Sequence, residues 1–229
     1  MEIRSAEINP ASASGPAARS SLGDEVAERI RQSIFSGEYP LGSRLGEVEI
    51  ATRLDVSRGP VREALGQLRQ EGIVEIRMHR GASVVRVTAE DVRELASLRV
   101  VLESFAMRSA AKNATENDFA ALQAIVDDMQ RAIDALDDAR LIQLDIDFHD
   151  RVYVAAKHSL LYATWVPLRS RVQLFLSQSI GEHTAYRARA VREHGELLET
   201  LRSRHAGAAA KGGKSHIEAA YDRLLAQFE

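Results

Sequence analysis

The spacing of apolar residues predicts short helices in the first part of the chain. In SRGPVREALGQLRQEG, residues 57–72, the apolar positions Val61, Leu65 and Leu68 recur every three or four residues, the period of one helix face. Ser57 suits the N-cap, because its hydroxyl can accept a hydrogen bond from a first-turn N–H, and Gly72 suits the helix end. EVAERIRQSIFSGEY and EVEIATRL show the same period upstream. Three helices are therefore expected here.

The residues that follow the third helix alternate instead. Apolar and charged residues alternate over residues 74–78. The segment HRGA is then expected to form a turn, and further valines follow up to Val87. A period of two is typical of strands, so we predict a hairpin with His79 and Arg80 at its tip. Asp55, Val56 and Ser57 form a short turn between the second and third helices. Residues 21–87 are thus predicted to form a winged helix-turn-helix.

Residues 88–229 return to the helical period throughout. Thr88 and Thr115 can cap two helices, and four more fit residues 139–157, 160–180, 185–205 and 208–228. Gly212 and Gly213 are expected to kink or break the last of these, because glycine costs roughly 1 kcal/mol each relative to alanine in a helix. The predicted fold is mainly α: an N-terminal winged helix-turn-helix plus a C-terminal all-α helical bundle. Residues 1–20, rich in Ala, Ser and Pro, are expected to form a flexible tail.

Composition narrows the environment in which such a protein works. The chain has 229 residues, a net charge of -3 and no cysteine, which excludes disulfides and thiolate metal sites. No apolar run is long enough for a membrane helix, and the N-terminus lacks the apolar core of a signal peptide. We expect a cytoplasmic protein that binds no membrane.

Arginine is concentrated on one helix of the predicted DNA-binding fold. Residues 22–87 hold ten Arg and ten acidic residues, but residues 53–80 hold six Arg against four acids. Arg58, Arg62 and Arg69 fall within about 40° of one another on the third helix, roughly a quarter-turn from its apolar stripe. A solvated charged face would look the same. The helix-turn-helix context favours DNA, because the arginine fork can hold phosphate oxygens or a guanine edge.

A carboxylate and an imidazole interrupt the apolar stripe of one bundle helix. In LIQLDIDFHDRV, Asp145 and His149 lie four residues apart and therefore one above the other. A buried Asp–His hydrogen bond is one interpretation. However, His194 and His216 lie on the two following helices, and three imidazoles with a carboxylate suit zinc, nickel, iron or manganese.

Arg99 occupies the middle of another apolar stripe. A buried guanidinium needs an anion, and Glu103, four residues later, could supply it within the helix. A bound anion from outside the chain would serve equally well, so the residues alone leave both interpretations open.

The segment SGEYPLGSRLGEVEIATRLDVSRGPVREALGQLRQEGIVEIRMHRGASV resembles the DNA-binding half of GntR-family transcriptional regulators. The resemblance covers about 60 residues, and its VSR-x-PVREAL core is specific. It implies that Arg58 and Arg62 contact DNA, and that His79, Arg80 and Gly81 form a wing tip that reaches the minor groove. Ser57 and Arg69, on the same helix, complete the expected DNA-binding set. Gly59, where the family commonly has Thr, and Leu41, where it has Pro, depart from the pattern.

The second half resembles the helical FCD domain that accompanies this winged helix in one subfamily. LDIDFH, EHGELLETL and SHIEAA are similar to its metal-ligand segments. The resemblance implies that a divalent metal ion, most often zinc, is bound by four residues: Asp145, His149, His194 and His216. It also implies that Arg99 binds the carboxylate of a small organic-acid effector. Arg171 and Tyr153 are weaker candidates for the pocket wall, and His205 is expected on the surface.

These features predict a transcriptional regulator rather than an enzyme. It would be a homodimer, since two recognition helices about one DNA turn apart read a palindromic operator. A small carboxylate bound near the metal would control operator affinity. Two alternatives remain at this point: a DNA-binding protein whose helical half serves only dimerisation, and a metal-dependent hydrolase.

Overall fold

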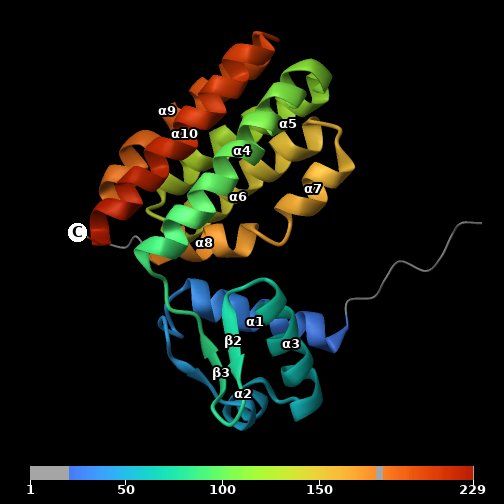
Figure 1. The fold of residues 1–229 in the computed structure, drawn as a ribbon, viewed down its shortest axis with the longest axis vertical. Coiled ribbons are helices and arrows are strands. Elements are labelled where there is room, and N and C mark those ends of the chain that lie inside the picture. Colours follow the sequence, from blue (N-terminus) through green and yellow to red (C-terminus); the bar gives the residue numbers. More distant parts are fainter. Residues whose placement is uncertain (1–20, 179–182, 229) are drawn as a thin grey trace, which may run out of the picture.

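The computed structural model describes residues 21–178 and 183–228, and helices dominate both halves of the fold (Figure 1). The N-terminal elements are α1 (Leu22–Phe35), β1 (Arg44–Leu45), α2 (Glu47–Leu54), α3 (Arg58–Gln70), β2 (Val74–Arg77) and β3 (Gly81–Val84). The C-terminal elements are α4 (Ala89–Asn113), α5 (Glu116–Asp134), α6 (Asp138–Ala155), α7 (Ser159–Trp165), α8 (Arg169–Gln178), α9 (His183–Arg202), α10 (Ala206–Leu225) and a 3-10 turn (Ala226–Phe228). The predicted mainly α fold class is confirmed. The expected tail, residues 1–20, lies outside the described residues.

The N-terminal half is a winged helix-turn-helix. Its antiparallel sheet has the order β1-β3-β2, with Val74 opposite Val84 and Arg77 opposite Gly81. The two-residue strand β1 was not expected, because it is too short to show a period. Only part of the alternating pattern in β2 is buried. Val74 is buried, whereas Met78 at the turn is 84% exposed, so the hairpin reaches away from the core into solvent.

The predicted helix starts are mostly confirmed. Thr88 and Thr115 each form a capping box, with Asp91 and Asp118 respectively. Ser57 is the N-cap of α3 as expected, but its hydroxyl makes no capping hydrogen bond. Pro60 removes one of the two usual donors, because it occupies the third helical position and proline has no N–H. The prediction that the Ser57 hydroxyl accepts a capping hydrogen bond is therefore wrong.

The single helix predicted over residues 160–180 is also wrong within the described residues. The chain forms α7 and α8 instead, and Pro167 lies between them. Proline cannot continue the backbone hydrogen bonds of a helix and clashes with the preceding turn. The break allows α8 to lie across the base of the bundle, next to α1 of the N-terminal half (Figure 1). Residues 179–180 of that prediction lie outside the described residues.

The last helix is continuous, contrary to the predicted kink or break at Gly212 and Gly213. The long helices α4 and α10 run side by side in Figure 1, and a side chain at Gly213 would collide with the buried Met107 of α4. Glycine lowers the stability of a helix, but because Gly213 has no side chain the two helices can pack closely, and this packing offsets the loss.

The two halves meet where α8 contacts the end of α3. Ser170 Oγ donates a hydrogen bond to Glu71 Oε2 over 2.7 Å, and Arg31 Nε of α1 donates to the same oxygen over 3.0 Å. Glu71 is the C-cap residue of α3. The helix that carries the arginine face is therefore joined directly to the bundle. No helix among the described residues has the length and apolar character needed to cross a membrane.

Candidate metal and effector site and DNA-binding face

Three histidines from three helices converge inside the bundle. His149 comes from α6, His194 from α9 and His216 from α10. One ring nitrogen of each lies within 4.8 Å of those of the other two, a spacing at which one metal ion could contact all three. His149 and His194 are buried, and His216 is partly buried. The structure thus brings together histidines that are 22 to 67 residues apart in sequence.

The outer ring nitrogens of this cluster are held by hydrogen bonds. His149 Nδ1 donates to Glu103 Oε1 over 2.7 Å, and His194 Nδ1 donates to the carbonyl oxygen of Ala190 over 2.8 Å. With the proton on Nδ1, the lone pair lies on Nε2. Both Nε2 atoms are buried; that of His149 has no hydrogen-bond partner among the described residues, and that of His194 faces only Asp145 Oδ1, 3.1 Å away. Nε2 atoms placed in this way fit a metal ion, because metal-binding histidines are commonly oriented by such outer bonds.

Asp145 lies beside the cluster and remains ionised. Its Oδ1 is 3.1 Å from His194 Nε2, and its Oδ2 is 3.9 Å from His149 Nε2. Burial raises the pKa of Asp145, but the His194 hydrogen bond and the nearby charges of His149 and Arg99 bring it well below its usual range. Burial lowers the pKa of His216 well below its usual value, assisted by the other two histidines.

The Asp145 carboxylate changes the pKa of His194 in the opposite direction, upward. Burial lowers its pKa, but Asp145 raises it by more, so a proton competes with a metal ion for this imidazole. A carboxylate, a neutral imidazole and two imidazoles oriented from behind are the donor types that a divalent transition metal prefers.

Arg99 lies in the same region and does not pair with Glu103. The Glu103 carboxylate is instead bonded to His149, and Arg99 and Glu103 form no ion pair with each other. Arg99 is 2% exposed, and its Nε and Nη2 have no hydrogen-bond partner among the described residues. Its Cζ lies 5.4 Å from the centroid of the Trp165 ring. The guanidinium is therefore oriented by an aromatic surface while two of its donors stay available.

A cavity of about 60 Å³ connects Arg99 with the histidine cluster. Its wall comes from the five helices α4, α6, α8, α9 and α10 and includes Arg99, Asp145, Tyr186, His194, His216 and Leu224. By volume it has room for a handful of water-sized groups, which restricts a fully enclosed ligand to a small molecule. Two sequence candidates do not line it. The Tyr153 ring stacks on the Trp165 ring, with 4.9 Å between their centroids. Arg171 Nε donates a hydrogen bond to the Gly72 carbonyl oxygen over 3.4 Å.

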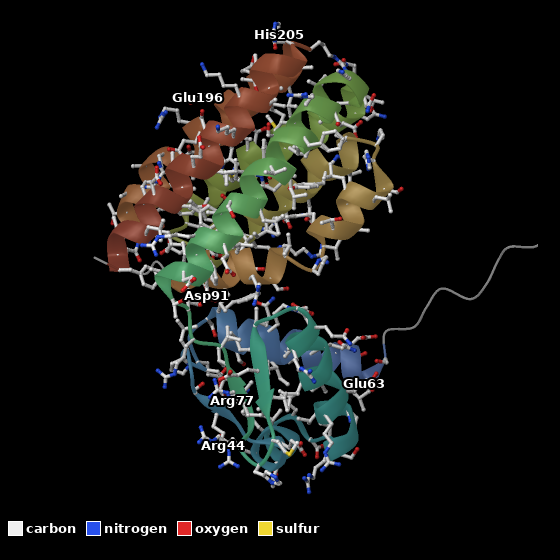
Figure 2. All side chains as sticks on the ribbon, viewed as in Figure 1. Arg44, Glu63, Arg77, Asp91, Glu196 and His205 are labelled. Atoms are coloured by element: carbon white, nitrogen blue, oxygen red, sulfur yellow. The ribbon has the colours of Figure 1, made fainter. Side chains whose placement is uncertain are left out.

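Sequence reasoning missed two residues of the site. Tyr186 OH donates to Asp145 Oδ1 over 3.0 Å, and no motif around Tyr186 indicated this. Glu103 had been considered only as a partner for Arg99, whereas it orients His149. The exposed position expected for His205 is confirmed: it caps α10 at the far end of the bundle (Figure 2).

The exposed arginines of α3 form two separate groups. Arg58 and Arg62 both donate to Glu47 of α2, and their side chains are 55% and 60% exposed. Arg69 is also exposed, but it lies about 10 Å beyond Arg62 and about 16 Å beyond Arg58 along the helix axis, at the end that adjoins α8. The structure therefore joins Arg58 with Arg62 and leaves Arg69 apart.

The wing lies at the end of the N-terminal half remote from the bundle. His79, Arg80 and Gly81 are exposed at the hairpin turn, where His79 and Gly81 adopt positive φ values of 63° and 78°. Figure 2 shows Arg44 and Arg77 directed outward on this half. Arg44 belongs to the unexpected strand β1, and its Nη2 would lie 4.0 Å from a β-carbon on Gly81. It adds a cation beside the wing tip that sequence reasoning missed.

A winged helix-turn-helix with an exposed arginine helix, joined to a helical bundle, defines a DNA-binding transcriptional regulator. The chain belongs to the GntR family. Residues 22–84 match "Bacterial regulatory proteins, gntR family", and residues 94–219 match the FCD domain. Members of this family are transcriptional regulators and not enzymes, which excludes the metal-dependent hydrolase considered from the sequence.

Named relatives agree with this assignment. The chain is 32% identical over 162 residues to the gluconate operon transcriptional repressor of Bacillus subtilis (strain 168), covering 71% of this chain and 66% of that protein. It is 29% identical over 199 residues to the HTH-type transcriptional repressor RspR of Escherichia coli (strain K12), covering 86% of each. The solved structure of E. coli McbR/YncC superimposes with a TM-score of 0.80 at 22% identity, covering 92% of this chain and 100% of that chain. That likeness shows the shared fold.

Proposed function

We propose that this regulator senses a small organic acid in its bundle and adjusts its operator affinity accordingly. The observation that carries the proposal is the gathering of polar groups without hydrogen-bond partners at one buried place. These are Nε2 of His149 together with Nε and Nη2 of Arg99, and Nε2 of His194 beside them faces only the Asp145 carboxylate. Buried polar atoms are normally paired, and groups left unpaired in a cavity are candidates for ligand binding.

Asp145, His149, His194 and His216 would hold a divalent metal ion. Three imidazoles and one carboxylate favour zinc, with nickel, iron or manganese as other ions of suitable chemistry. When bound, the ion supplies positive charge and a coordination position for an oxygen of the effector. Glu103 and the Ala190 carbonyl keep His149 and His194 in the required tautomer.

Arg99 would bind the effector carboxylate. A guanidinium presents two parallel N–H groups that match the two oxygens of a carboxylate, and a buried pair of this type is stronger than an exposed one. Glu103 is already bonded to His149, and Arg99 forms no ion pair with any of the residues that the structure describes. An anionic ligand in the adjoining cavity would do so.

Effector binding would reach the DNA through α8. Leu176 of this helix lines the cavity, and Ser170, two turns earlier, bonds to Glu71 at the end of α3. A ligand shifts the regulator only if it binds one arrangement of the two halves better than another. The contact between α8 and α3 is where the two arrangements would differ.

The functional unit would be a homodimer on a palindromic DNA operator. The partner we expect at the outer face of α4 is a second copy of this chain. Leu98, Val101 and Phe105 lie on one side of α4 and are 43%, 65% and 43% exposed, an apolar stripe at helical spacing. Two copies are needed to present two recognition helices to two half-sites. Val101→Glu should convert the protein to a monomer in sedimentation, and an unchanged dimer would exclude this face.

Elemental analysis tests the metal. Wild-type protein reconstituted with zinc should carry about one ion per chain, and His149→Ala should lose it together with the stabilisation that a ligand of the folded form provides. The control is His205→Asn, which alters an exposed histidine and keeps a residue able to cap α10. Absence of metal from wild type after reconstitution with zinc or nickel would refute the four-residue site.

A gel-shift titration at fixed salt tests the DNA contact. Arg62→Ala should weaken operator binding by roughly 1–3 kcal/mol, with the loss concentrated at one base position if the contact is to guanine. Arg192→Ala, which removes the same charge from an exposed residue of α9, should leave binding unchanged. Equal binding by wild type and Arg62→Ala would exclude the assignment.

A further inference from the structure

Glu47 joins the two arginines that the DNA-binding face presents together. It is the first residue of α2, where an acid is favoured by the helix dipole. Its side chain turns toward α3, however. Oε2 accepts a hydrogen bond from Arg58 Nη2 over 2.9 Å and another from Arg62 Nε over 2.7 Å. A single carboxylate oxygen therefore fixes two guanidinium groups that lie one helical turn apart.

This network contributes little to folding. The side chains of Glu47, Arg58 and Arg62 are 32%, 55% and 60% exposed, and ion pairs between exposed residues stabilise proteins only slightly. The hydrogen bonds from Arg58 and then Arg62 lower the pKa of Glu47, so the carboxylate is ionised at neutral pH. A negative charge here also repels DNA phosphates. Its presence at this position needs an explanation other than stability or general DNA affinity.

The explanation for Glu47 lies in how it orders the two arginine side chains. Arginine has a flexible side chain, and ordering it on binding costs affinity unless it is ordered beforehand. Glu47 uses Nε of Arg62, which leaves Nη1 and Nη2 as a pair of donors at the outer end of the fork. That pair is suited to two acceptors side by side, such as O6 and N7 of guanine.

We propose that Glu47 is a positioning residue for operator recognition. It holds Arg58 and Arg62 ready to read bases, and its charge simultaneously weakens binding to DNA that offers only phosphates. This inference rests on the proposed DNA contacts of the two arginines and goes beyond them. It predicts that Glu47 governs the ratio of specific to non-specific affinity, which a residue with a purely structural role would not change.

The chain offers a matched control in Glu49. This residue belongs to the same first turn of α2 and carries the same charge, but it forms no hydrogen bond or ion pair among the described residues. Glu47→Gln and Glu49→Gln therefore remove equal charge from neighbouring positions. Only the first weakens the link to the arginines. Both variants should melt within a few degrees of wild type, because the positions are exposed.

The experiment uses full-length protein and two duplexes of equal length at one salt concentration. One is the duplex that wild type enriches from a randomised library, and the other is a scrambled version. Glu49→Gln should tighten binding to both duplexes by a similar factor. Glu47→Gln should tighten binding to the scrambled duplex but weaken binding to the selected one, which lowers the specificity ratio roughly tenfold. In an Arg58→Ala/Arg62→Ala background, Glu47→Gln should no longer change the ratio.

Two results would overturn the proposal, and they differ in meaning. If Arg62→Ala weakens operator binding but Glu47→Gln behaves like Glu49→Gln, the positioning role fails and the DNA contact stands. If Arg62→Ala itself leaves operator binding unchanged, the DNA contact fails and the role of Glu47 fails with it.

Discussion

Gly213 of α10 and Met107 of α4 lie in direct contact at the centre of the bundle. A β-carbon on Gly213 would lie 2.7 Å from Met107 Cγ, closer than carbon atoms approach without a shift, and 3.3 Å from Met107 Cβ, a tight contact. Met107 is fully buried, and buried side chains are closely packed. The glycine thus sets the distance between α10, which carries His216, and α4, which carries Arg99 and Glu103.

Gly213→Ala should therefore destabilise the protein by roughly 1–3 kcal/mol through overpacking. Gly212→Ala is the matched control, because its β-carbon would make only an ordinary 3.5 Å contact with Thr200. That variant should gain roughly 0.5–1 kcal/mol from the better helix propensity of alanine. Thermal melting measures both, and equal shifts in the same direction would contradict the packing role of Gly213.

Arg99→Met should keep the fold and impair effector response. Methionine fills similar volume and removes a buried charge that has no ion pair with Glu103. Loss of a charge-assisted bond to the effector carboxylate should raise the concentration of acid needed for half-maximal release from DNA by about 10- to 100-fold. DNA affinity without acid should stay at the wild-type level. A large drop in melting temperature with an intact response would remove Arg99 from the site.

Ser170→Ala should uncouple the two halves without affecting either. It removes the hydrogen bond to Glu71, while Arg31 still holds that carboxylate. Effector binding measured by calorimetry should be unchanged, but the effector-dependent change in operator affinity should fall several-fold. Ser177→Ala is the control, since within the described part of the chain this hydroxyl of the same helix bonds only to the Leu174 carbonyl. A full response in Ser170→Ala would exclude this contact as the route between the halves.

Asp118 should make stability depend on acid pH. Burial raises the pKa of its carboxyl, but hydrogen bonds from Thr115 and the charges of Lys157 and Arg151 lower it by more, so the pKa is below its ordinary value. A lowered pKa means that the stabilisation is complete above the unfolded value of about 3.9 and is lost as pH falls through the folded value.

Asp118→Asn should consequently cost roughly 1–3 kcal/mol at about pH 7, and the difference from wild type should shrink toward about pH 3. Asp91→Asn alters the matching capping box of α4, where Asp91 has no cationic partner among the described residues, and so isolates the loss of a cap. Melting curves at several pH values decide the matter. If the stability difference between wild type and Asp118→Asn grew as the pH fell, the lowered pKa assigned to Asp118 would be wrong.

The sequence could predict those features that depend on local chemistry. The caps at Thr88 and Thr115 follow from Ser/Thr-x-x-Asp spacing, and the four-residue separation of Asp145 and His149 places them on one helix face whatever the helix contacts. His194 and His216 could be added because histidine is scarce in the chain and two segments resemble known ligand segments.

Features that depend on packing between helices could not be predicted in this way. Glu103 is within reach of Arg99 along α4, but α6 packs against α4 and brings His149 to the Glu103 carboxylate, which accepts its hydrogen bond instead. Gly213 is unfavourable for a helix when judged alone and becomes necessary only when Met107 faces it. Pro167 did carry a local signal for a break between α7 and α8, but the apolar period continues across it and masked that signal.

Trp165 gives the protein an optical reporter of its own. It is the one tryptophan in the sequence, it is fully buried, and its ring lies under the Arg99 guanidinium. Indole emission shifts with the charge and polarity of its surroundings. A carboxylate that neutralises Arg99 should therefore change the fluorescence of the unlabelled protein, and the change should be absent in Arg99→Met. Candidate acids can thus be screened in a plate reader before any operator is known.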